Sequence, residues 1–139
     1  MDNEVHILSP TIRVGDDDRF IDQGGKREFC IGIDNKGRLK AEAISTKNGI
    51  IRTSILPNGK VFGGMPIPAY NKMLDIIRKV HPRLSVVPLI GWDLLVDSKS
   101  DVILLECNLN WPGISKYQEC NGPFFGELTT EVLNRFILK

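Results

Sequence analysis

Three polar side chains, Asp93, Glu106 and Asn108, have the types and the spacing expected of a metal site. Carboxylate and amide oxygens are hard ligands that suit magnesium, which usually keeps several waters and completes its coordination with substrate phosphates. The residues stand in two apolar segments separated by a short polar stretch, so whether they meet depends on how those segments pair. If they meet, the pattern points to magnesium-dependent nucleotide chemistry.

The segments that carry these residues are predicted to form a β-hairpin. Pro88–Val96 and Val102–Leu105 are apolar runs of strand length, and they flank the polar tetrapeptide Ser98–Asp101. Apolar runs separated by a few polar turn residues are typical of antiparallel strands joined by a tight turn.

The register of this hairpin decides whether the acids meet. A loop of two or four residues centred in the tetrapeptide places Asp93 opposite Glu106 and Gly91 opposite Asn108, with all four on one face. Directly opposed residues have Cβ atoms about 4.5–5.5 Å apart, close enough for two carboxylates to hold one ion. A three-residue loop instead shifts the register by one position, places Asp93 opposite Leu105 and separates the cluster.

Two interpretations of the acids follow from the pattern alone. Like charges directly opposite each other destabilise a sheet, and a divalent cation between Asp93 and Glu106 removes that repulsion. Alternatively, both are ordinary acids at strand ends whose side chains point into solvent and never meet. Strand boundaries are too loosely defined by periodicity to choose between these interpretations.

The same region resembles a known enzyme family. Ile90–Asp93, Leu104–Asn108 and Trp111–Gly113 together resemble the end of the catalytic domain of ATP-grasp enzymes, whose metal-binding motif is an Asp followed by Glu-x-Asn. The similarity is to the branch associated with sugar transfer and capsular polysaccharide loci, which is related to α-L-glutamate ligase-like proteins. Further matches occur upstream, in the same order as in that branch: a Thr-x-Arg strand at Ser9–Val14, a Gly-Gly turn at Gln23–Gly25 and a helix entry at Gly63–Pro68.

The resemblance implies roles for particular residues. Asp93, Glu106 and Asn108 are expected to hold one or two magnesium ions against the ATP phosphates, and Asn108 to contact the nucleotide as well. Arg13 is expected to act in catalysis, at the transferred phosphate or the acceptor carboxylate, and with Gly24-Gly25 to help bind ATP. From the residues alone Arg13 could equally pair with a neighbouring acid, and Gly24-Gly25 could be a plain chain reversal.

The activity implied is ATP-dependent ligation in cell-surface polysaccharide biosynthesis. The γ-phosphate of ATP passes to a small-molecule carboxylate, and an amine or similar nucleophile attacks the acyl phosphate. Positioning and charge neutralisation supply most of the catalysis of phosphoryl transfer, so acids, an amide and an arginine suffice. The alternatives are a noncatalytic module that binds a nucleotide or a partner chain, and a metal-dependent phosphoesterase.

Two features depart from the family pattern. In many relatives two residues separate the Asn from Pro-Gly, whereas here Leu109–Trp111 intervene. The lysine-bearing half that grips the nucleotide in this superfamily is expected upstream, and eight residues precede Ser9. Residues 1–139 are therefore expected to be a single domain equivalent to the C-terminal half of an ATP-grasp catalytic domain. The expected partner is a missing N-terminal half or, in a homo-oligomer, a further copy of the chain.

The remaining elements predict an α+β fold, an antiparallel sheet with helices packed on one face, like the C-terminal subdomain of ATP-grasp proteins. Glu28–Asp34 and Arg38–Ser45 alternate apolar and polar residues around the turn Asn35–Gly37, Thr11–Val14 is a candidate edge strand, and Pro68–His81 has helical periodicity. The alternation in the first of these strands predicts one better-buried face. A second helix is predicted at the C-terminus from the spacing of Leu128, Val132, Leu133, Phe136 and Ile137.

Composition argues against other function classes. The formal net charge of the 139 residues is +1, which offers no electrostatic basis for binding nucleic acid. Neither a leader nor an apolar run long enough to cross a bilayer is present, so a cytoplasmic setting is expected. Cys30, Cys107 and Cys120 lack the spacing of a zinc site or a disulfide framework and are expected to be buried thiols.

Overall fold

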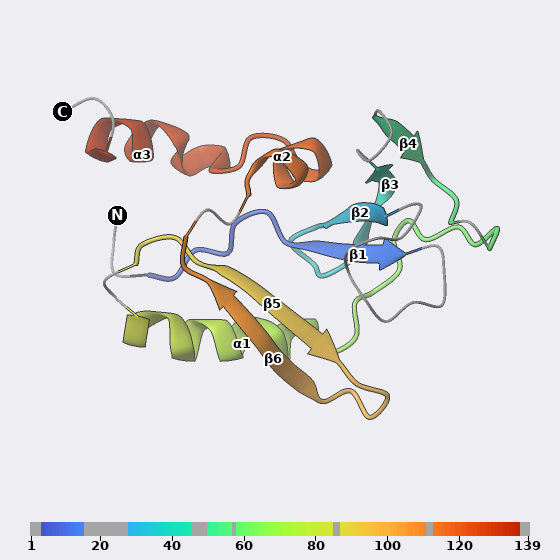
Figure 1. Cartoon of the computed structure of the whole chain (residues 1–139), viewed down its shortest axis with the longest axis horizontal. Helices are drawn as coiled ribbons and strands as arrows, with labels where there is room; N and C mark the ends of the chain where they lie inside the picture. Colours follow the sequence, from blue (N-terminus) through green and yellow to red (C-terminus); the bar gives the residue numbers. More distant parts are fainter. Residues whose placement is uncertain are drawn as a thin grey trace. The chain divides into compact units, whose positions relative to one another are not determined.

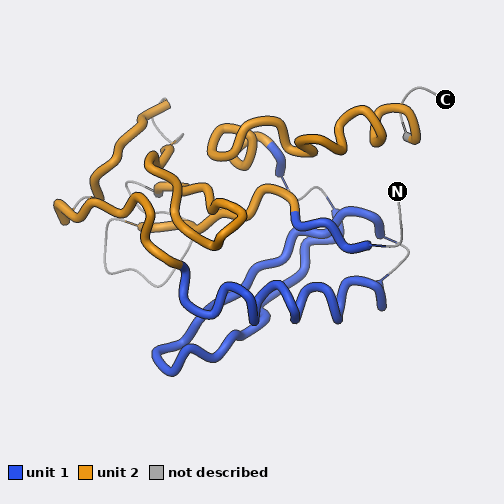
Figure 2. Tube along the Cα trace, turned by 180° about the vertical axis from the view of Figure 1, so that it is seen from behind, with its two compact units in different colours: residues 1–7, 67–114 blue, residues 8–66, 115–139 orange. Residues whose placement is uncertain are grey.

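The computed structural model describes residues 4–15, 28–45, 50–56, 58–84, 87–110 and 113–136. The chain divides into two compact units, each built from two separate stretches of sequence (Figure 2). The first unit comprises residues 1–7 and 67–114, and the second comprises residues 8–66 and 115–139.

The second unit contains a four-stranded antiparallel sheet (Figure 1). Its strands are β1 (Thr11–Gly15), β2 (Glu28–Ile33), β3 (Leu39–Ser45) and β4 (Ile51–Thr53), and they lie side by side in that order. The predicted hairpin and the predicted edge strand are both confirmed, because β2 pairs with β3 and β1 occupies the edge beside β2.

One face of this sheet carries the core of the second unit. The fully or nearly buried side chains of that core are Phe29, Ile31, Ala43 and Phe62. Partly buried apolar side chains from β1, β3 and the segment after β4 pack around it, namely Ile12, Val14, Leu39 and Leu56. Burying each large apolar side chain contributes about 1.5–3 kcal/mol, so this cluster is a main source of the unit's stability.

The opposite face of the sheet is covered as well, by a helix that the alternation of β2 did not predict. Cys30 and Gly32 point away from the core, yet both are buried. The short helix α2 (Ser115–Asn121) packs on them, so closely that a Cβ atom at Gly32 would lie 2.9 Å from the backbone oxygen of Cys120. Alternation within β2 could not predict this cover, because α2 comes from a distant part of the sequence.

The first unit consists of a helix and a hairpin. Helix α1 spans Tyr70–Val80, a 3-10 turn continues over His81–Leu84, and β5 (Gly91–Val96) pairs with β6 (Val102–Asn108). The predicted helix is confirmed, and the residues of its apolar stripe are buried or half-buried: Tyr70, Met73, Leu74, Ile77 and Val80.

Helix α1 is bound to the hairpin at both of its ends. Near its start, Lys72 Nζ lies 2.7 Å from Asp101 Oδ1 in the hairpin turn. Just after its end, the Trp92 indole Nε1 on β5 donates to His81 Nδ1 over 3.3 Å. The helix therefore lies alongside the two strands (Figure 1).

The C-terminal part of the second unit is helical. A 3-10 turn (Gly126–Leu128) leads into α3 (Thr129–Phe136), which confirms the second predicted helix. Antiparallel sheets with segregated helices make the fold α+β, as predicted. Among the described residues, no helix combines the length and the apolar character needed to cross a membrane.

Candidate functional site

The hairpin pairs the residues that were predicted to form the site. Asp93 is the partner of Glu106, and Gly91 is the partner of Asn108. Alternation along each strand then places all four on one face of the hairpin. The pairing of the acids expected from a two- or four-residue loop is confirmed at this end of the hairpin.

The hairpin reaches this pairing through a three-residue loop and a β-bulge, and not through a two- or four-residue loop. The turn is a three-residue loop, because Asp97 N donates to Asp101 O and Ser100 N donates to Asp97 O, each over 3.0 Å. With such a loop Leu94 pairs with Leu104, which by itself would separate the acids. A β-bulge at Leu105 adds one residue to β6 and restores the pairing of the acids beyond it.

The loop is stabilised by one side chain. Asp97 Oδ1 accepts hydrogen bonds from the backbone N–H groups of Lys99 and Asp101, over 2.9 and 2.8 Å. Ser100 adopts a left-handed conformation with φ of 63°, which is unusual for a residue with a Cβ atom. The sequence does not indicate a three-residue loop here, because glycine normally occupies the left-handed position that Ser100 takes.

The β2–β3 hairpin is closed by the same arrangement. Asp34 Oδ1 accepts from the backbone N–H groups of Lys36 and Arg38, over 2.8 and 2.9 Å, and Gly37 takes the left-handed position with φ of 72°. The hydrogen bond from the Arg38 backbone is the main reason that the pKa of Asp34 lies below its usual range. Two Asp-initiated turns of one design thus close the two hairpins.

The three predicted metal ligands contact one another. Asn108 Nδ2 donates to Asp93 Oδ2 over 3.2 Å and to Glu106 Oε1 over 3.0 Å. The positive end of the amide dipole therefore points at two carboxylates that would otherwise repel each other. Gly91, opposite Asn108, adds no side chain to this face.

The donor set suits a hard cation. The cluster offers two carboxylates and one amide as ligands. In the described part of the chain, no group of three His, Cys, Asp or Glu side chains is arranged as a metal site. A partial oxygen shell of this kind matches magnesium, which keeps waters and takes further oxygens from a phosphate. It does not match zinc, which favours nitrogen and sulfur ligands.

An apolar strip continues the same face of the hairpin. Leu95 follows Asp93 by two positions and pairs with Ile103, so these two side chains share the face of the acids. They are 48% and 43% exposed, respectively. The face thus joins an anionic end to an exposed apolar surface.

The other face of the hairpin supports the site. Trp92 points away from the acids and binds His81, with ring centroids 6.1 Å apart. Partial burial lowers the pKa of His81, and its Nδ1 can accept the indole hydrogen bond only when the imidazole is neutral. This contact fixes the strand between Gly91 and Asp93.

The other predicted site residues are not part of the β5–β6 hairpin. Arg13 is exposed on β1, opposite Cys30, and belongs to the second unit, whereas the acids belong to the first. Gly24-Gly25 and Trp111 lie outside the described residues. The roles of Arg13 and Gly24-Gly25 stay predictions.

The cysteines only partly match expectation. Cys30 is buried, Cys120 is half-buried and Cys107 is exposed. The prediction of a buried thiol is wrong for Cys107, because β6 belongs to a two-stranded sheet and most of its side chains are exposed. Sequence reasoning also missed that Cys30 and Cys120 meet, since 90 positions separate them.

One known protein family matches nearly the whole chain. The profile of the family described as sugar-transfer associated ATP-grasp matches residues 1–133. No curated protein and no solved structure matched the chain. The match covers nearly all of the 139 residues, including the Asp and the Glu-x-Asn of the hairpin. The chain therefore belongs to the sugar-transfer associated ATP-grasp family and is a domain of the ATP-binding, ligase-like ATP-grasp type.

Proposed function

We propose that this chain binds Mg²⁺ and ATP at the β5–β6 hairpin and takes part in ATP-dependent ligation of a carboxylate, in the biosynthesis of a cell-surface polysaccharide. The observation that carries the proposal is the contact of Asn108 with both Asp93 and Glu106. Two acids on opposite strands, bridged by a polarised amide, provide oxygen ligands for a cation-binding site.

The residues have distinct parts in this proposal. Asp93 and Glu106 supply charged oxygens, and Asn108 supplies a third, neutral one. A bound magnesium ion supplies charge neutralisation and orientation of the ATP phosphates. The exposed strip of Leu95 and Ile103 offers an apolar support for the flat, uncharged part of a nucleotide.

The ligation itself needs positioned groups and no covalent nucleophile. Transfer of the γ-phosphoryl group to a carboxylate oxygen gives ADP and an acyl phosphate, and attack by an amine forms the new bond and releases phosphate. Arg13 is the residue proposed to hold the transferred phosphate or the acceptor carboxylate, because a guanidinium binds either through two parallel hydrogen bonds. Gly24-Gly25 is proposed to approach the nucleotide through backbone amides.

The organisation of the catalytic domain is part of the proposal. Residues 1–139 are taken as the part that carries the metal ligands, corresponding to the C-terminal half of an ATP-grasp catalytic domain. The nucleotide-gripping half is then supplied by another segment. The alternative of a noncatalytic module has two forms. A module that binds a nucleotide makes the same prediction for metal binding and differs only in turnover, whereas a module that binds a partner chain does not require metal binding.

Calorimetry tests the proposed site. Magnesium with a nonhydrolysable ATP analogue is titrated into the chain and into Asp93→Asn and Glu106→Gln variants. Each variant removes one of two charged ligands, so we expect affinity to fall by about tenfold or more. The matched control is Asp75→Asn, which removes one charge from a side chain that is 78% exposed on α1 of the same unit.

The outcomes separate the function classes. Loss of binding in both ligand variants and retention in Asp75→Asn support the ATP-grasp site. Equal binding by all four proteins contradicts it. Cleavage of a phosphate ester by the chain with Mg²⁺ and without ATP would instead favour the metal-dependent phosphoesterase.

A further inference from the structure

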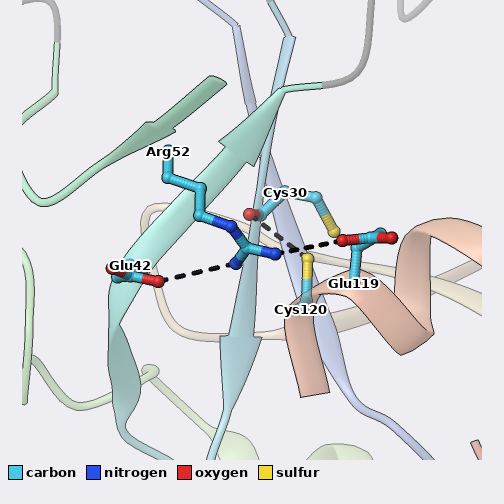
Figure 3. Close-up of polar contacts among 5 residues, drawn as sticks. All are labelled: Cys30, Glu42, Arg52, Glu119 and Cys120. Atoms are coloured by element: carbon cyan, nitrogen blue, oxygen red, sulfur yellow. Dashed lines mark hydrogen bonds and ion pairs between the residues drawn. The ribbon is translucent and has the colours of Figure 1, made fainter. Parts of the chain in front are cut away.

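Two thiols from distant parts of the sequence meet on the α2 face of the four-stranded sheet. Cys30 lies at the centre of β2 and Cys120 in the last turn of α2. The Cys120 thiol donates to the carbonyl oxygen of Cys30 over 3.4 Å, and the same thiol hydrogen is close enough to the Cys30 sulfur to bond it instead when Cys30 is a thiolate. Figure 3 shows the two sulfur atoms facing each other between the strand and the helix.

Helix α2 is fixed in the position that brings the thiols together. Arg52 on β4 reaches Glu119, the neighbour of Cys120, over 3.1 Å, and also reaches Glu42 on β3 over 3.5 Å (Figure 3). At the end of the helix, Asn121 Nδ2 donates to the carbonyl of Pro10 over 3.2 Å. These two contacts tie the helix to β4 and to the segment before β1, so the approach of the thiols does not depend on one interaction.

The surroundings favour a thiolate at this pair. The hydrogen bond from Cys120 lowers the pKa of Cys30 to about 7 despite the opposing effect of burial, with smaller contributions from Thr11, Lys116 and Arg13. The same hydrogen bond and burial raise the pKa of Cys120. The pair thus releases one proton near neutral pH, and the second sulfur keeps its proton as the donor.

We infer that Cys30 and Cys120 are a redox-active dithiol, which a hydroperoxide oxidises to an intramolecular disulfide that tethers α2 to β2. The juxtaposed sulfurs, the clamped helix and the cationic surroundings carry this inference independently of the ATP site. A small oxidant is required, because Cys30 is only 5% exposed.

In this reaction two thiols and one molecule of hydrogen peroxide give one disulfide and two molecules of water. The Cys30 thiolate attacks one peroxide oxygen, the O–O bond breaks, and the departing hydroxide is protonated to water. The Cys120 sulfur then attacks the Cys30 sulfenic acid, the S–O bond breaks, and the second hydroxide leaves as water with the Cys120 proton. Two electrons pass from the sulfurs to the peroxide. An external dithiol then reduces the protein disulfide to the two thiols by exchange and is itself oxidised to a disulfide.

Mass spectrometry of the folded chain tests the inference. The exposed Cys107 is first replaced by Ser, so that Cys30 and Cys120 are the two remaining cysteines. With about one equivalent of hydrogen peroxide we expect the intact mass to fall by about 2 Da through loss of two hydrogens. Proteolysis should give a linked peptide containing both cysteines, and dithiothreitol should restore the starting mass.

Two comparisons make the result decisive. In a Cys107→Ser, Cys120→Ser variant the reaction should stop at a Cys30 sulfenic acid that dimedone traps. In urea the Cys107→Ser protein should form the link more slowly, because unfolding separates residues that are 90 positions apart. A sulfinic acid without a linked peptide, unreacted thiols in the folded chain, or faster linking in urea would each overturn the inference.

The pH dependence of the oxidation rate distinguishes an activated thiolate from two thiols that merely lie close together. The oxidation rate of the Cys107→Ser protein should rise with a midpoint near pH 7, where the pKa of Cys30 lies. Lys116→Gln should move the midpoint to higher pH, whereas Lys99→Gln, in the other unit, should not. The polar and charged groups that face the pair from β1, β3, β4 and α2 are Thr11, Arg13, Lys40, Arg52, Lys116 and Glu119. A profile with no rise between pH 6 and 8 would contradict the assigned thiolate.

Discussion

At the scale of single residues, Asn108 separates two like charges that the hairpin register brings together. Its Nδ2 hydrogens lie between Asp93 and Glu106, where a cation is proposed to bind. The amide therefore stabilises the hairpin without a metal and offers an oxygen when a metal is present. Replacing Asn108 with a third carboxylate removes the stabilisation of the metal-free hairpin and provides a charged oxygen that binds a cation more strongly.

Asn108→Asp is predicted to make folding depend on magnesium. Without metal, a third negative charge on one face should lower the free energy of unfolding by about 1 kcal/mol. Millimolar magnesium should reverse most of this loss, because a ligand that binds the folded state stabilises it. Urea denaturation with and without magnesium measures both effects. Asn71→Asp, at an exposed position of α1, is the control. If magnesium shifts both variants equally, the cluster is not a metal site.

His81 is predicted to give the fold a pH dependence. Burial lowers the pKa of His81 below its ordinary value of 6.5, so the unfolded chain binds a proton more readily than the folded one. The associated stability is fully present above pH 6.5 and is lost as the pH falls through the lower pKa of the folded state. Protonation also removes the acceptor of the Trp92 hydrogen bond.

Denaturation in urea at several pH values between 5 and 7.5 measures this effect. The free energy of unfolding should decrease below pH 6.5 in the unaltered chain, and this decrease should be smaller in His81→Gln. His6→Gln controls for the loss of a histidine. A decrease of equal size in the unaltered chain and in His81→Gln would assign the effect to another group.

At the scale of elements, the two hairpins show one turn design with different residues at the strained position. Gly37 has φ of 72° in the β2–β3 turn, and Ser100 has φ of 63° in the β5–β6 turn. In both turns an Asp at the first position binds two backbone N–H groups. The Ser100 turn sets the register that the Leu105 bulge then corrects, so its stability bears directly on the site.

Exchanging the residues at the strained position is predicted to give opposite effects. A left-handed conformation costs a residue with a Cβ atom about 1–2 kcal/mol, part of which is offset by the greater flexibility of glycine in the unfolded chain. Ser100→Gly should therefore raise the free energy of unfolding by up to about 1 kcal/mol, and Gly37→Ser should lower it by a similar amount. Chemical denaturation of both variants checks the pair, and effects of the same sign would contradict the shared design.

The elements also show how far sequence patterns reach. The β2–β3 hairpin and helix α1 could be predicted, because alternation, helical spacing and turn residues are local signals. These signals left the pairing of the acids open, and the resemblance to ATP-grasp enzymes favoured it. The loop length stayed open because Ser100 occupies a position that usually requires glycine, and the Leu105 bulge compensates for the three-residue loop. Helix α2 was missed because seven residues are too few to show an apolar stripe.

At the scale of the whole molecule, contacts across long sequence separations lay beyond prediction. The meeting of Cys30 and Cys120, and the burial of Gly32 under α2, join segments that no local pattern connects. The candidate site could be predicted because its three residues lie within one hairpin. Arg13 was assigned by resemblance alone, and its place in the second unit leaves that role as a proposal.

The central claim is that Asp93, Glu106 and Asn108 bind a divalent cation together with ATP. Nuclear magnetic resonance of the chain during titration with Mn²⁺ and a nonhydrolysable ATP analogue tests it most directly, because a paramagnetic ion broadens the signals of the nuclei nearest to it. We expect the amide signals of these three residues to broaden first and to recover when excess Mg²⁺ displaces Mn²⁺. Broadening centred on other residues, or none at the β5–β6 hairpin, would contradict the account.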